Sequence, residues 1–313
     1  MAQARESFRS RMTRRRAVLS LALGHPLNRG KAVRTLARVA GWQAWRHLVR
    51  KPITVAFWKG LRVRVYPDWP YSWTAIYFRL TEYDDMLFAV RYLRPGDPFI
   101  DVGANIGYYS LLASLVNEQA PVLALEPHPI ASRRLQENAS INSFGNIRVR
   151  AVAVGRISGT ANLTSDLVEQ NRISVGNENA VATVAVPVVT LDATLPQEGI
   201  DPADVRLVKI DTEGFEVNVL AGAHDLLEAR PGPVWLVELA GLGNRYGQDD
   251  LAVRKIFGER GYKAFRYRAD ENRLVNSDEN NAESGNVIFL RDPEAVSSHL
   301  DLETFVAAGA TKA

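Results

Sequence analysis

Short, almost entirely apolar runs alternate with amphipathic segments over residues 97–290. The apolar runs predict strands, at 98–102, 121–126, 147–154, 205–211, 233–239, 262–268 and 286–290. The amphipathic segments predict helices, at 108–117, 130–141, 215–229 and 250–260. Strands that alternate with helices are joined by crossover connections, so the pattern predicts an α/β fold built on a mostly parallel sheet.

The stretch 159–190 interrupts this alternation. Its two apolar runs, 160–164 and 181–189, predict an inserted β-hairpin with a polar tip near 171–179. Between the last two strands, residues 269–285 are polar and predict an irregular loop. We find no internal repeat in the sequence.

The first 96 residues follow a different pattern. Apolar residues recur at helical spacing over 30–50, which predicts a helix, and two runs flanking Lys59-Gly60 predict a hairpin over 53–66. Five of the six tryptophans lie within 42–73. Such aromatic side chains stack on a sugar or cover a substrate in some proteins, but packing against a core is their commoner role.

Charge is distributed unevenly along the chain. Residues 1–50 hold 12 Lys and Arg residues and one acid, Glu6, although the whole chain has a net charge of only +3. A basic arm of this kind contacts nucleic acid or an anionic membrane surface, or is simply a solvated helix. We predict a basic helical arm at 1–50, an accessory hairpin and helix at 51–96, a main domain at 97–292 and a C-terminal tail at 293–313.

Composition excludes several classes of protein. There is no cysteine, which removes disulfides, thiolate metal sites and cysteine nucleophiles. No apolar run approaches the roughly 18 residues that a membrane-spanning helix needs. Residues 13–17 weakly resemble a twin-arginine leader, but the apolar run 17–24 is followed by no cleavage site, so we expect no export and a cytoplasmic location.

The turn after the first predicted strand of the main domain is rich in glycine. It reads Asp101-Val-Gly103-Ala-Asn105-Ile-Gly107, and the next strand ends at Glu126, a position suited to a ribose diol. The G-x-G-x-x-G spacing that a pyrophosphate requires is absent, and so is a phosphate-binding P-loop. The turn is therefore suited to a nucleoside without phosphates, of which S-adenosylmethionine (SAM) is the common example.

Three stretches carry a family resemblance: 99–110 (FIDVGANIGYYS), 124–129 (ALEPHP) and 208–216 (VKIDTEGFE), with Thr190-Leu-Asp192 in support. They resemble the FkbM family of SAM-dependent methyltransferases over about 82–263. The resemblance implies the class I methyltransferase fold, a Rossmann-like sheet of seven strands whose last strand is antiparallel. It also implies methyl transfer to oxygen, typically to a hydroxyl of a sugar, polyketide or other metabolite, by the domain at 97–292.

The third stretch also has a physical interpretation of its own. Lys209 and Asp211 share one face of a strand that a parallel sheet normally buries, and buried charges are costly unless they are paired or lie at the strand mouth. Gly214 allows the turn that follows to approach a ligand closely. Glu213 and Glu216 lie at a helix start, where acidic residues are favoured in any case.

Glu238 ends the neighbouring strand, so its side chain is expected close to Asp211. One carboxylate then acts as the general base for an attacking hydroxyl; alternatively, Asp211, Glu213 and Glu238 bind Mg²⁺. We favour the base, because no His-rich or Asp-Asn cluster accompanies these acids. His128 and His224 are further candidate bases, and Lys209 is either catalytic or a structural partner of the acids.

We therefore predict a SAM-dependent O-methyltransferase. The predicted catalytic residues are Lys209, Asp211, Glu213 and Glu238; the predicted cofactor-binding residues are Glu82, Asp101, Gly103, Asn105, Gly107, Glu126, Pro127, Ala153 and Asp211. Tyr77, Glu82, Tyr83 and the insertion 159–189 are expected to cover the site. The expected acceptor is a small molecule or glycan. One rival function is an RNA or protein methyltransferase that binds its substrate through the basic arm. The acidic main domain disfavours that function. The other rival is a non-catalytic SAM-fold module.

Overall fold

The structure is a computed structural model, and it describes residues 17–165, 171–174, 182–277 and 285–300. The chain divides into two compact units, one up to Tyr83 and one from Asp84. All three motif stretches lie in the second unit. Much of the tip predicted near 171–179 lies outside the described residues.

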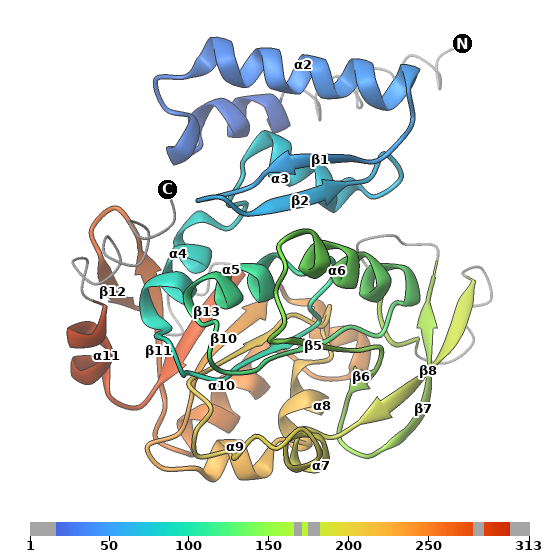
Figure 1. Ribbon diagram of the computed structural model, residues 1–313. Coiled ribbons are helices and arrows are strands. Elements are labelled where there is room, and N and C mark those ends of the chain that lie inside the picture. Colours follow the sequence, from blue (N-terminus) through green and yellow to red (C-terminus); the bar gives the residue numbers. More distant parts are fainter. Residues whose placement is uncertain (1–16, 166–170, 175–181, 278–284, 301–313) are drawn as a thin grey trace, which may run out of the picture. The chain divides into compact units, whose positions relative to one another are not determined.

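The first unit consists of helices and one hairpin (Figure 1). Its elements are a helix at 17–24, η1 (Pro26–Asn28), α2 (Ala32–Leu48), β1 (Ile53–Ala56), β2 (Arg62–Val65), η2 (Pro70–Trp73) and α3 (Thr74–Tyr77). Strands β1 and β2 are antiparallel, with Ile53 opposite Val65. The predicted helix and hairpin are thus confirmed.

Tryptophans hold this unit together. Trp42 and Trp69 are buried, and the Arg46 guanidinium lies 3.8 Å from the ring centroid of Trp73. These side chains serve the packing role that aromatic residues most often have.

The second unit is built on a sheet of eight strands in the order β12-β11-β13-β10-β9-β3-β4-β5. Their bounds are β3 (Phe99–Val102), β4 (Val122–Leu125), β5 (Ile147–Arg150), β9 (Leu207–Ile210), β10 (Val234–Leu239), β11 (Lys263–Arg268), β12 (Arg273–Asn276) and β13 (Gly285–Leu290). The central strands pair in parallel, and β13 is antiparallel to both neighbours. This confirms the predicted class I methyltransferase arrangement, to which β12 adds an eighth strand beyond the seven predicted.

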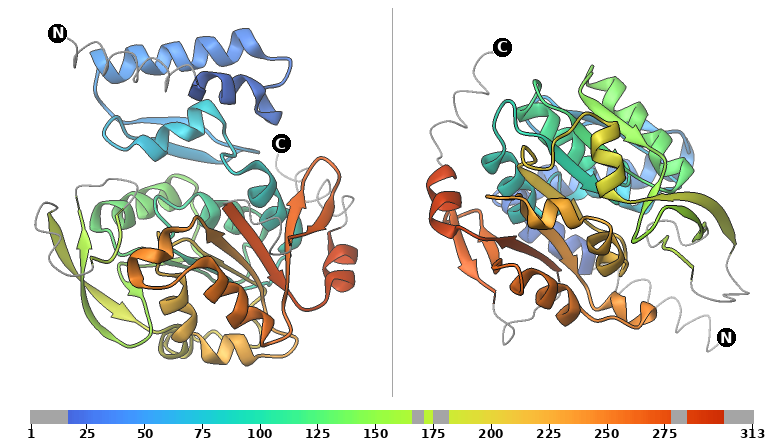
Figure 2. Two further views of the ribbon diagram at one scale, coloured as in Figure 1. Left: turned by 180° about the vertical axis from the view of Figure 1, so that it is seen from behind. Right: turned by 90° about the horizontal axis from the view of Figure 1, so that it is seen from below.

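Helices cover both faces of this sheet (Figures 1 and 2). They are α4 (Tyr83–Tyr92), α5 (Tyr108–Val116), α6 (Pro129–Ile141), α7 (Leu191–Gln197), α8 (Glu216–Ala221), α9 (His224–Glu228), α10 (Asp250–Gly258) and α11 (Pro293–His299). A large core cluster lies between the sheet and α7 to α10. Helices α5 and α6 lie on the opposite face, the one that Asp101 faces. No helix of the described residues has the length and apolar character needed to cross a bilayer.

The insertion forms a small sheet of its own. Strands β7 (Gly159–Thr164) and β8 (Thr183–Val189) pair as the predicted hairpin, and β6 (Ala153–Val154) pairs in parallel with β8. The sequence predicts one strand over 147–154, but the chain leaves the edge of the main sheet after β5 and joins the insertion instead.

Two further differences from the predicted elements have physical causes. The helix predicted at 215–229 is broken into α8 and α9 at Gly222, where an added Cβ would lie 2.2 Å from the Gly155 carbonyl oxygen. Strand β12 forms within the segment predicted as a loop. It is a short edge strand without a buried side chain, so it lacks an apolar signature in the sequence.

We predict that Phe257→Ala destabilises the second unit strongly. The Phe257 ring is fully buried and stacks on Phe289 at a centroid distance of 4.2 Å. The free energy of unfolding in urea should fall by about 3–5 kcal/mol. The matched control is Leu251→Ala in the same helix, whose side chain is 53% exposed and should cost less than about 1 kcal/mol. Equal losses in the two variants would contradict this view of the core.

Candidate active site

Two turns meet at the carboxyl ends of β3 and β9. Gly103 has φ +79°, and a Cβ built on it would lie 1.8 Å from the carbonyl oxygen of Asp211. The Asp211 amide in turn donates to the Val102 carbonyl over 3.0 Å. Only glycine fits this approach, so the glycine turn and the Asp211 turn form one continuous surface.

Gly107 starts α5 at the end of the same turn. Its φ is +93°, and an added Cβ would lie 2.7 Å from Cγ of Leu135 in α6. Glycine is therefore required for the packing of the turn against α6. Nothing in this contact points to a ligand.

The Asp101 carboxylate lies under this turn and is 1% exposed. Oδ2 accepts from the Ser110 hydroxyl over 2.6 Å, whereas Oδ1 has no hydrogen-bond partner among the described residues. Burial raises the pKa of Asp101, and the nearby Lys209 charge opposes that shift. A buried carboxylate oxygen left unpaired is costly, so it is a strong candidate to meet a ligand.

Glu126 holds the glycine turn from the adjacent strand. Oε2 accepts from the Asn105 amide over 2.7 Å and Oε1 accepts from the His128 amide over 2.8 Å. Burial raises the pKa of Glu126 to about 7, although both hydrogen bonds act in the other direction. Each carboxylate oxygen keeps further lone pairs, so Glu126 is still able to accept a bond from a diol.

The residues that follow Glu126 have structural roles. Pro127 is half-buried and continues the turn. His128 caps α6, because its Nδ1 accepts from the Ala131 amide over 3.4 Å, and burial lowers its pKa. This cap accounts for His128 without a role as a base.

Lys209 and Asp211 form a buried ion pair. Their Nζ and Oδ2 atoms are 2.9 Å apart, and the Lys209 residue is 3% exposed. The ammonium also lies 4.7 Å from the ring centroid of Tyr109 in α5. Burial would raise the pKa of Asp211, but the positive charge of Lys209 and hydrogen bonds outweigh it and lower that pKa.

Glu238 shares a side-chain hydrogen bond with Asp211, which confirms the expected convergence of the two strand ends. The negative charge of Asp211 is the main cause that raises the pKa of Glu238, to about 9, and burial adds to it. At neutral pH the two carboxyl groups therefore hold one proton and one negative charge between them.

Glu213 and Glu216 follow in the same turn but differ in their surroundings. Glu216 is buried, and its Oε1 accepts from the Thr212 amide, the Thr212 hydroxyl and the Gly214 amide at 3.0–3.2 Å. It is thus a structural residue of the turn. Glu213 has φ +56° and a pKa raised to about 7, mainly by burial and by the Asp211 charge.

The acids do not form a good Mg²⁺ site. Among the described residues, no group of three or more His, Asp or Glu side chains has a metal-binding arrangement. Asp211 is already neutralised by Lys209, and the raised pKa of Glu238 keeps a proton on it. The donor set of Asp211, Glu213 and Glu238 therefore does not fit a hard divalent cation.

Three further candidates belong to other elements. Ala153 is in β6 of the small sheet, where its side chain packs with Leu163 and Val186. His224 is exposed on α9 beside Asp225. Glu82 belongs to the first unit, so its contact with the cofactor stays a prediction.

Three site residues were not predicted from the sequence. Ser110 and Tyr109 contact Asp101 and Lys209 from the first turn of α5. The hydroxyl of Tyr246, in η3 (Leu242–Tyr246), donates to the Ile173 carbonyl of the insertion over 2.8 Å. The helical pattern after Gly107 places Tyr109 and Ser110 in that first turn, which is the signal that identifies them.

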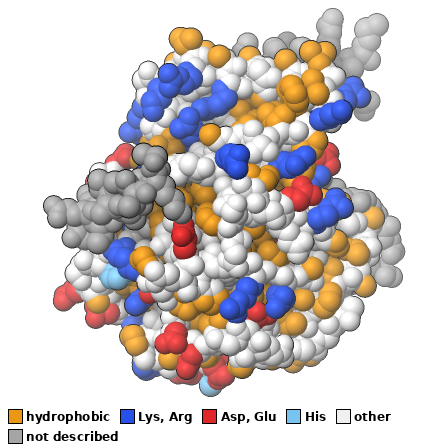
Figure 3. Space-filling view, in the orientation of Figure 1, with side chains coloured by type: hydrophobic (Ala, Val, Ile, Leu, Met, Phe, Trp, Pro, Cys, Tyr) orange, Lys and Arg blue, Asp and Glu red, His pale blue; other side chains and the backbone are white. Residues whose placement is uncertain are grey.

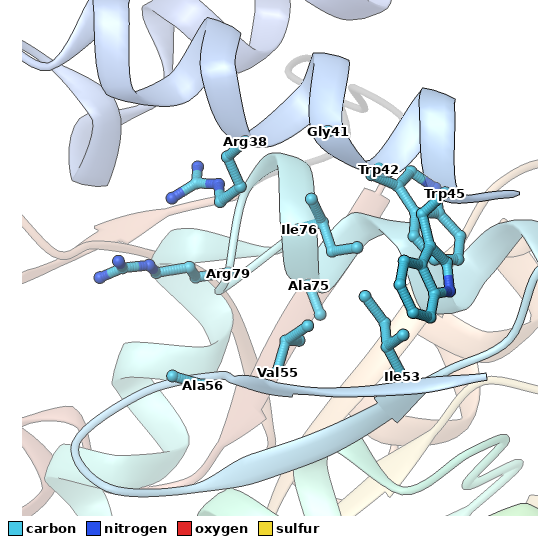
Figure 4. A pocket seen from close by; sticks show the side chains of 10 residues that line it. All are labelled: Arg38, Gly41, Trp42, Trp45, Ile53, Val55, Ala56, Ala75, Ile76 and Arg79. Carbon is cyan, nitrogen blue, oxygen red and sulfur yellow. The ribbon is translucent and has the colours of Figure 1, made fainter. Parts of the chain in front are cut away.

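The first unit contains a cavity of about 320 Å³ (Figure 4). Its walls are apolar and aromatic, with two guanidinium groups, and consist of Arg38, Gly41, Trp42, Trp45, Ile53, Val55, Ala56, Ala75, Ile76 and Arg79. No acid or histidine lines it, so it offers no general base. This cavity therefore adds no general base to the candidates at the strand ends of the second unit.

A family model described as the methyltransferase FkbM domain matches residues 101–264, just over half of the 313-residue chain. This chain belongs to the FkbM methyltransferase family. The match spans the glycine turn, Glu126, the Lys209–Asp211 pair and Glu238. It therefore confirms the family resemblance of the three sequence stretches.

Curated relatives match over a similar length. Methyltransferase sdnD of Sordaria araneosa is 31% identical over 163 residues, 42% of this chain and 62% of its own. The 31-O-demethyl-FK506 methyltransferase FkbM of Streptomyces tacrolimicus is 29% identical, with the same coverage. The hexuronic acid methyltransferase AglP of Haloferax volcanii is 28% identical over 137 residues, 42% of this chain and 52% of its own. The chain thus spans between half and two thirds of these relatives.

We predict that Asp211→Asn lowers the pKa of Glu238 well below its value of about 9. The charge of Asp211 is the largest cause of the raised value, and the substitution removes that charge while keeping the side-chain shape. Carboxyl carbon chemical shifts followed by NMR across pH 4–11 measure it. The control is Asp225→Asn, which is exposed on α9 and should leave the Glu238 titration unchanged. A midpoint still near 9 in Asp211→Asn would show that burial alone sets it.

Proposed function

We propose that this FkbM-family chain is a SAM-dependent O-methyltransferase. The proposed acceptor is a hydroxyl group on a sugar, glycan, polyketide or other small metabolite. The family match supports methyl transfer. Two relatives support the acceptor class by their names, one a 31-O-demethyl-FK506 methyltransferase and one a hexuronic acid methyltransferase.

The glycine turn and its neighbours fit SAM. Oδ1 of Asp101, which no described residue contacts by a hydrogen bond, is suited to a donor of the amino-acid tail, and Glu126 is suited to the ribose diol. Gly103 and Gly107 carry no side chain that would fill the turn, and the backbone amide of Asn105 fixes the path of the turn through its bond to Glu126. When bound, SAM supplies an electrophilic methyl group on a positively charged sulfur.

The observation that carries the proposal is the Asp211–Glu238 pair at the ends of neighbouring strands. The acceptor hydroxyl must lose its proton as its oxygen forms the new bond. The pKa of Glu238 is raised to about 9 and that of Asp211 is lowered, so deprotonated Glu238 is a stronger base than Asp211. Asp211, held by Lys209, orients Glu238 and keeps the negative charge close to the cofactor turn.

Lys209 and Glu213 have supporting roles in this scheme. The buried Lys209 ammonium compensates the charge of Asp211, so we assign it a positioning role. Glu213 lies in the turn that follows, where it is able to contact the acceptor. The insertion, linked to η3 by the Tyr246–Ile173 hydrogen bond, is the proposed cover that excludes water.

We predict that Glu126→Ala weakens SAM binding by at least about tenfold. The variant removes the diol acceptor and both hydrogen bonds that hold the turn, and a bond to a charged group contributes about 1.5–3 kcal/mol. Isothermal titration calorimetry with SAM measures the effect. The matched control is Glu137→Ala, a half-exposed carboxylate on α6, which should bind normally. Unchanged affinity in Glu126→Ala with a normal melting temperature would remove Glu126 from the site.

The function is tested by methyl transfer from isotopically labelled SAM to separated glycan, small-metabolite, lipid, RNA and protein fractions. We expect label in the glycan or small-metabolite fraction, with and without a chelator. Label only in RNA or protein would support the rival functions instead. SAM binding without transfer to any fraction would indicate a non-catalytic module.

Once an acceptor is known, Glu238→Gln tests the proposed base. We expect kcat to fall by about 10²- to 10⁴-fold, the usual contribution of a general base, while SAM affinity changes little. The wild-type kcat should rise with pH towards about 9, as the pair loses its proton, and this rise should be absent in Glu238→Gln. An equal pH dependence in both proteins would exclude Glu238 as the base.

A further inference from the structure

The solvent-facing side of α2 is apolar. Surface helices of globular proteins normally turn their apolar stripe towards the core. Here Thr35 and Trp42 are buried, whereas Val33 and Leu48 are 82% and 83% exposed. The exposed stripe, which we call the α2 stripe, repeats every three or four residues and consists of Val33, Leu36, Ala37, Ala40, Ala44 and Leu48.

Exposed apolar side chains are concentrated in this part of the molecule. Of the ten large hydrophobic residues exposed in the described ranges, seven lie in α2, just after it, or in the helix before it: Val18, Leu21, Val33, Leu36, Trp45, Leu48 and Val49. The space-filling view shows hydrophobic side chains along the edge formed by α2, with Lys and Arg side chains beside them (Figure 3). Scattered single residues need no explanation, but a cluster rimmed by charges indicates an interaction surface.

The charge around the stripe has one sign. Residues 17–67 contain ten Lys and Arg residues and no Asp or Glu. Exposed cations lie at both ends of the stripe, namely Lys31 and Arg34 at one end and Arg50 and Lys51 at the other. Trp45, partly exposed beside the stripe, donates its indole N–H to the Lys51 carbonyl over 2.8 Å, and such amphipathic rings favour a water–lipid boundary.

We propose that the α2 stripe and its flanking cations form a docking surface for an anionic lipid bilayer, on which α2 lies in the plane of the membrane. An interfacial helix buries its apolar face at the headgroup boundary while basic residues meet anionic lipid. Each Lys or Arg near such a surface contributes about 1 kcal/mol, which is roughly a fivefold gain in affinity.

Other occupants fit this surface less well. RNA would meet the cations, but the aliphatic stripe has no π-face on which bases stack. A second copy of this chain would cover the stripe, but it would bring the basic ends of two α2 helices together in either orientation. An anionic bilayer satisfies both the apolar stripe and the charge, which neither of these two occupants does.

The test is co-sedimentation of the full chain with vesicles. We expect binding to vesicles of equal parts phosphatidylglycerol and phosphatidylcholine to exceed binding to phosphatidylcholine alone by at least about tenfold. Arg34→Gln/Lys51→Gln should weaken binding to the anionic vesicles by about tenfold or more while leaving the melting temperature unchanged.

The stripe itself is tested by Val33→Ser/Leu48→Ser. Removing these two exposed side chains should lower anionic vesicle binding by at least about tenfold, because each buries apolar surface in the bilayer. The matched control is Ile157→Ser/Leu251→Ser, which removes two apolar side chains, 75% and 53% exposed, from the second unit and should bind as wild type.

Four results would overturn the proposal. The first is that the wild type does not bind vesicles, and the second is that the stripe and control variants lose binding equally. The third is that the wild type is a dimer that does not bind vesicles and that the stripe substitutions convert to a monomer. The fourth is that the wild type binds RNA but not vesicles. The proposal is independent of methyl transfer. A protein that binds vesicles but not SAM would contradict the proposed function alone.

Discussion

The buried ion pair of Lys209 and Asp211 is the constraint around which the candidate site is organised. Lys209 lies in β9, which pairs in parallel with β10 on one side and β3 on the other, and Asp211 follows directly after that strand. Removing one partner of such a pair leaves an uncompensated buried charge, which typically costs about 3–5 kcal/mol. The protonation of Asp101 and Glu238 is affected by the same two charges, so the acids at the strand ends behave as one electrostatic unit.

The sequence predicts those parts of the fold that carry a strong apolar signature. Strands β3, β4 and β9 are buried along their whole length, and the runs that encode them are almost uninterrupted. Strand β12 is a polar edge and the break at Gly222 comes from the distant Gly155 backbone, so neither has a local signal. Helices and strands are predictable where burial determines their composition. They are missed where contacts between distant segments determine where an element begins or ends.

The same distinction applies to the site. Asp101, Glu126, Asp211 and Glu238 are predictable because each ends a strand, and strand ends meet at one edge of the sheet. Their protonation states are not predictable from the sequence, because the proton shared by Asp211 and Glu238 depends on the distance between these two carboxyl groups. The double backbone contact of Glu126 likewise depends on a fold that brings Asn105 and His128 to either side of one side chain.

The contact between Gly103 and the Asp211 carbonyl has a consequence for re-engineering this scaffold. Because the two turns touch without room for a methyl group, neither can be lengthened, shortened or exchanged alone. Elements outside these two turns, such as β7 and β8 of the inserted sheet, are free of that restriction. Libraries aimed at new acceptors are best directed there, with both touching turns transplanted or retained together.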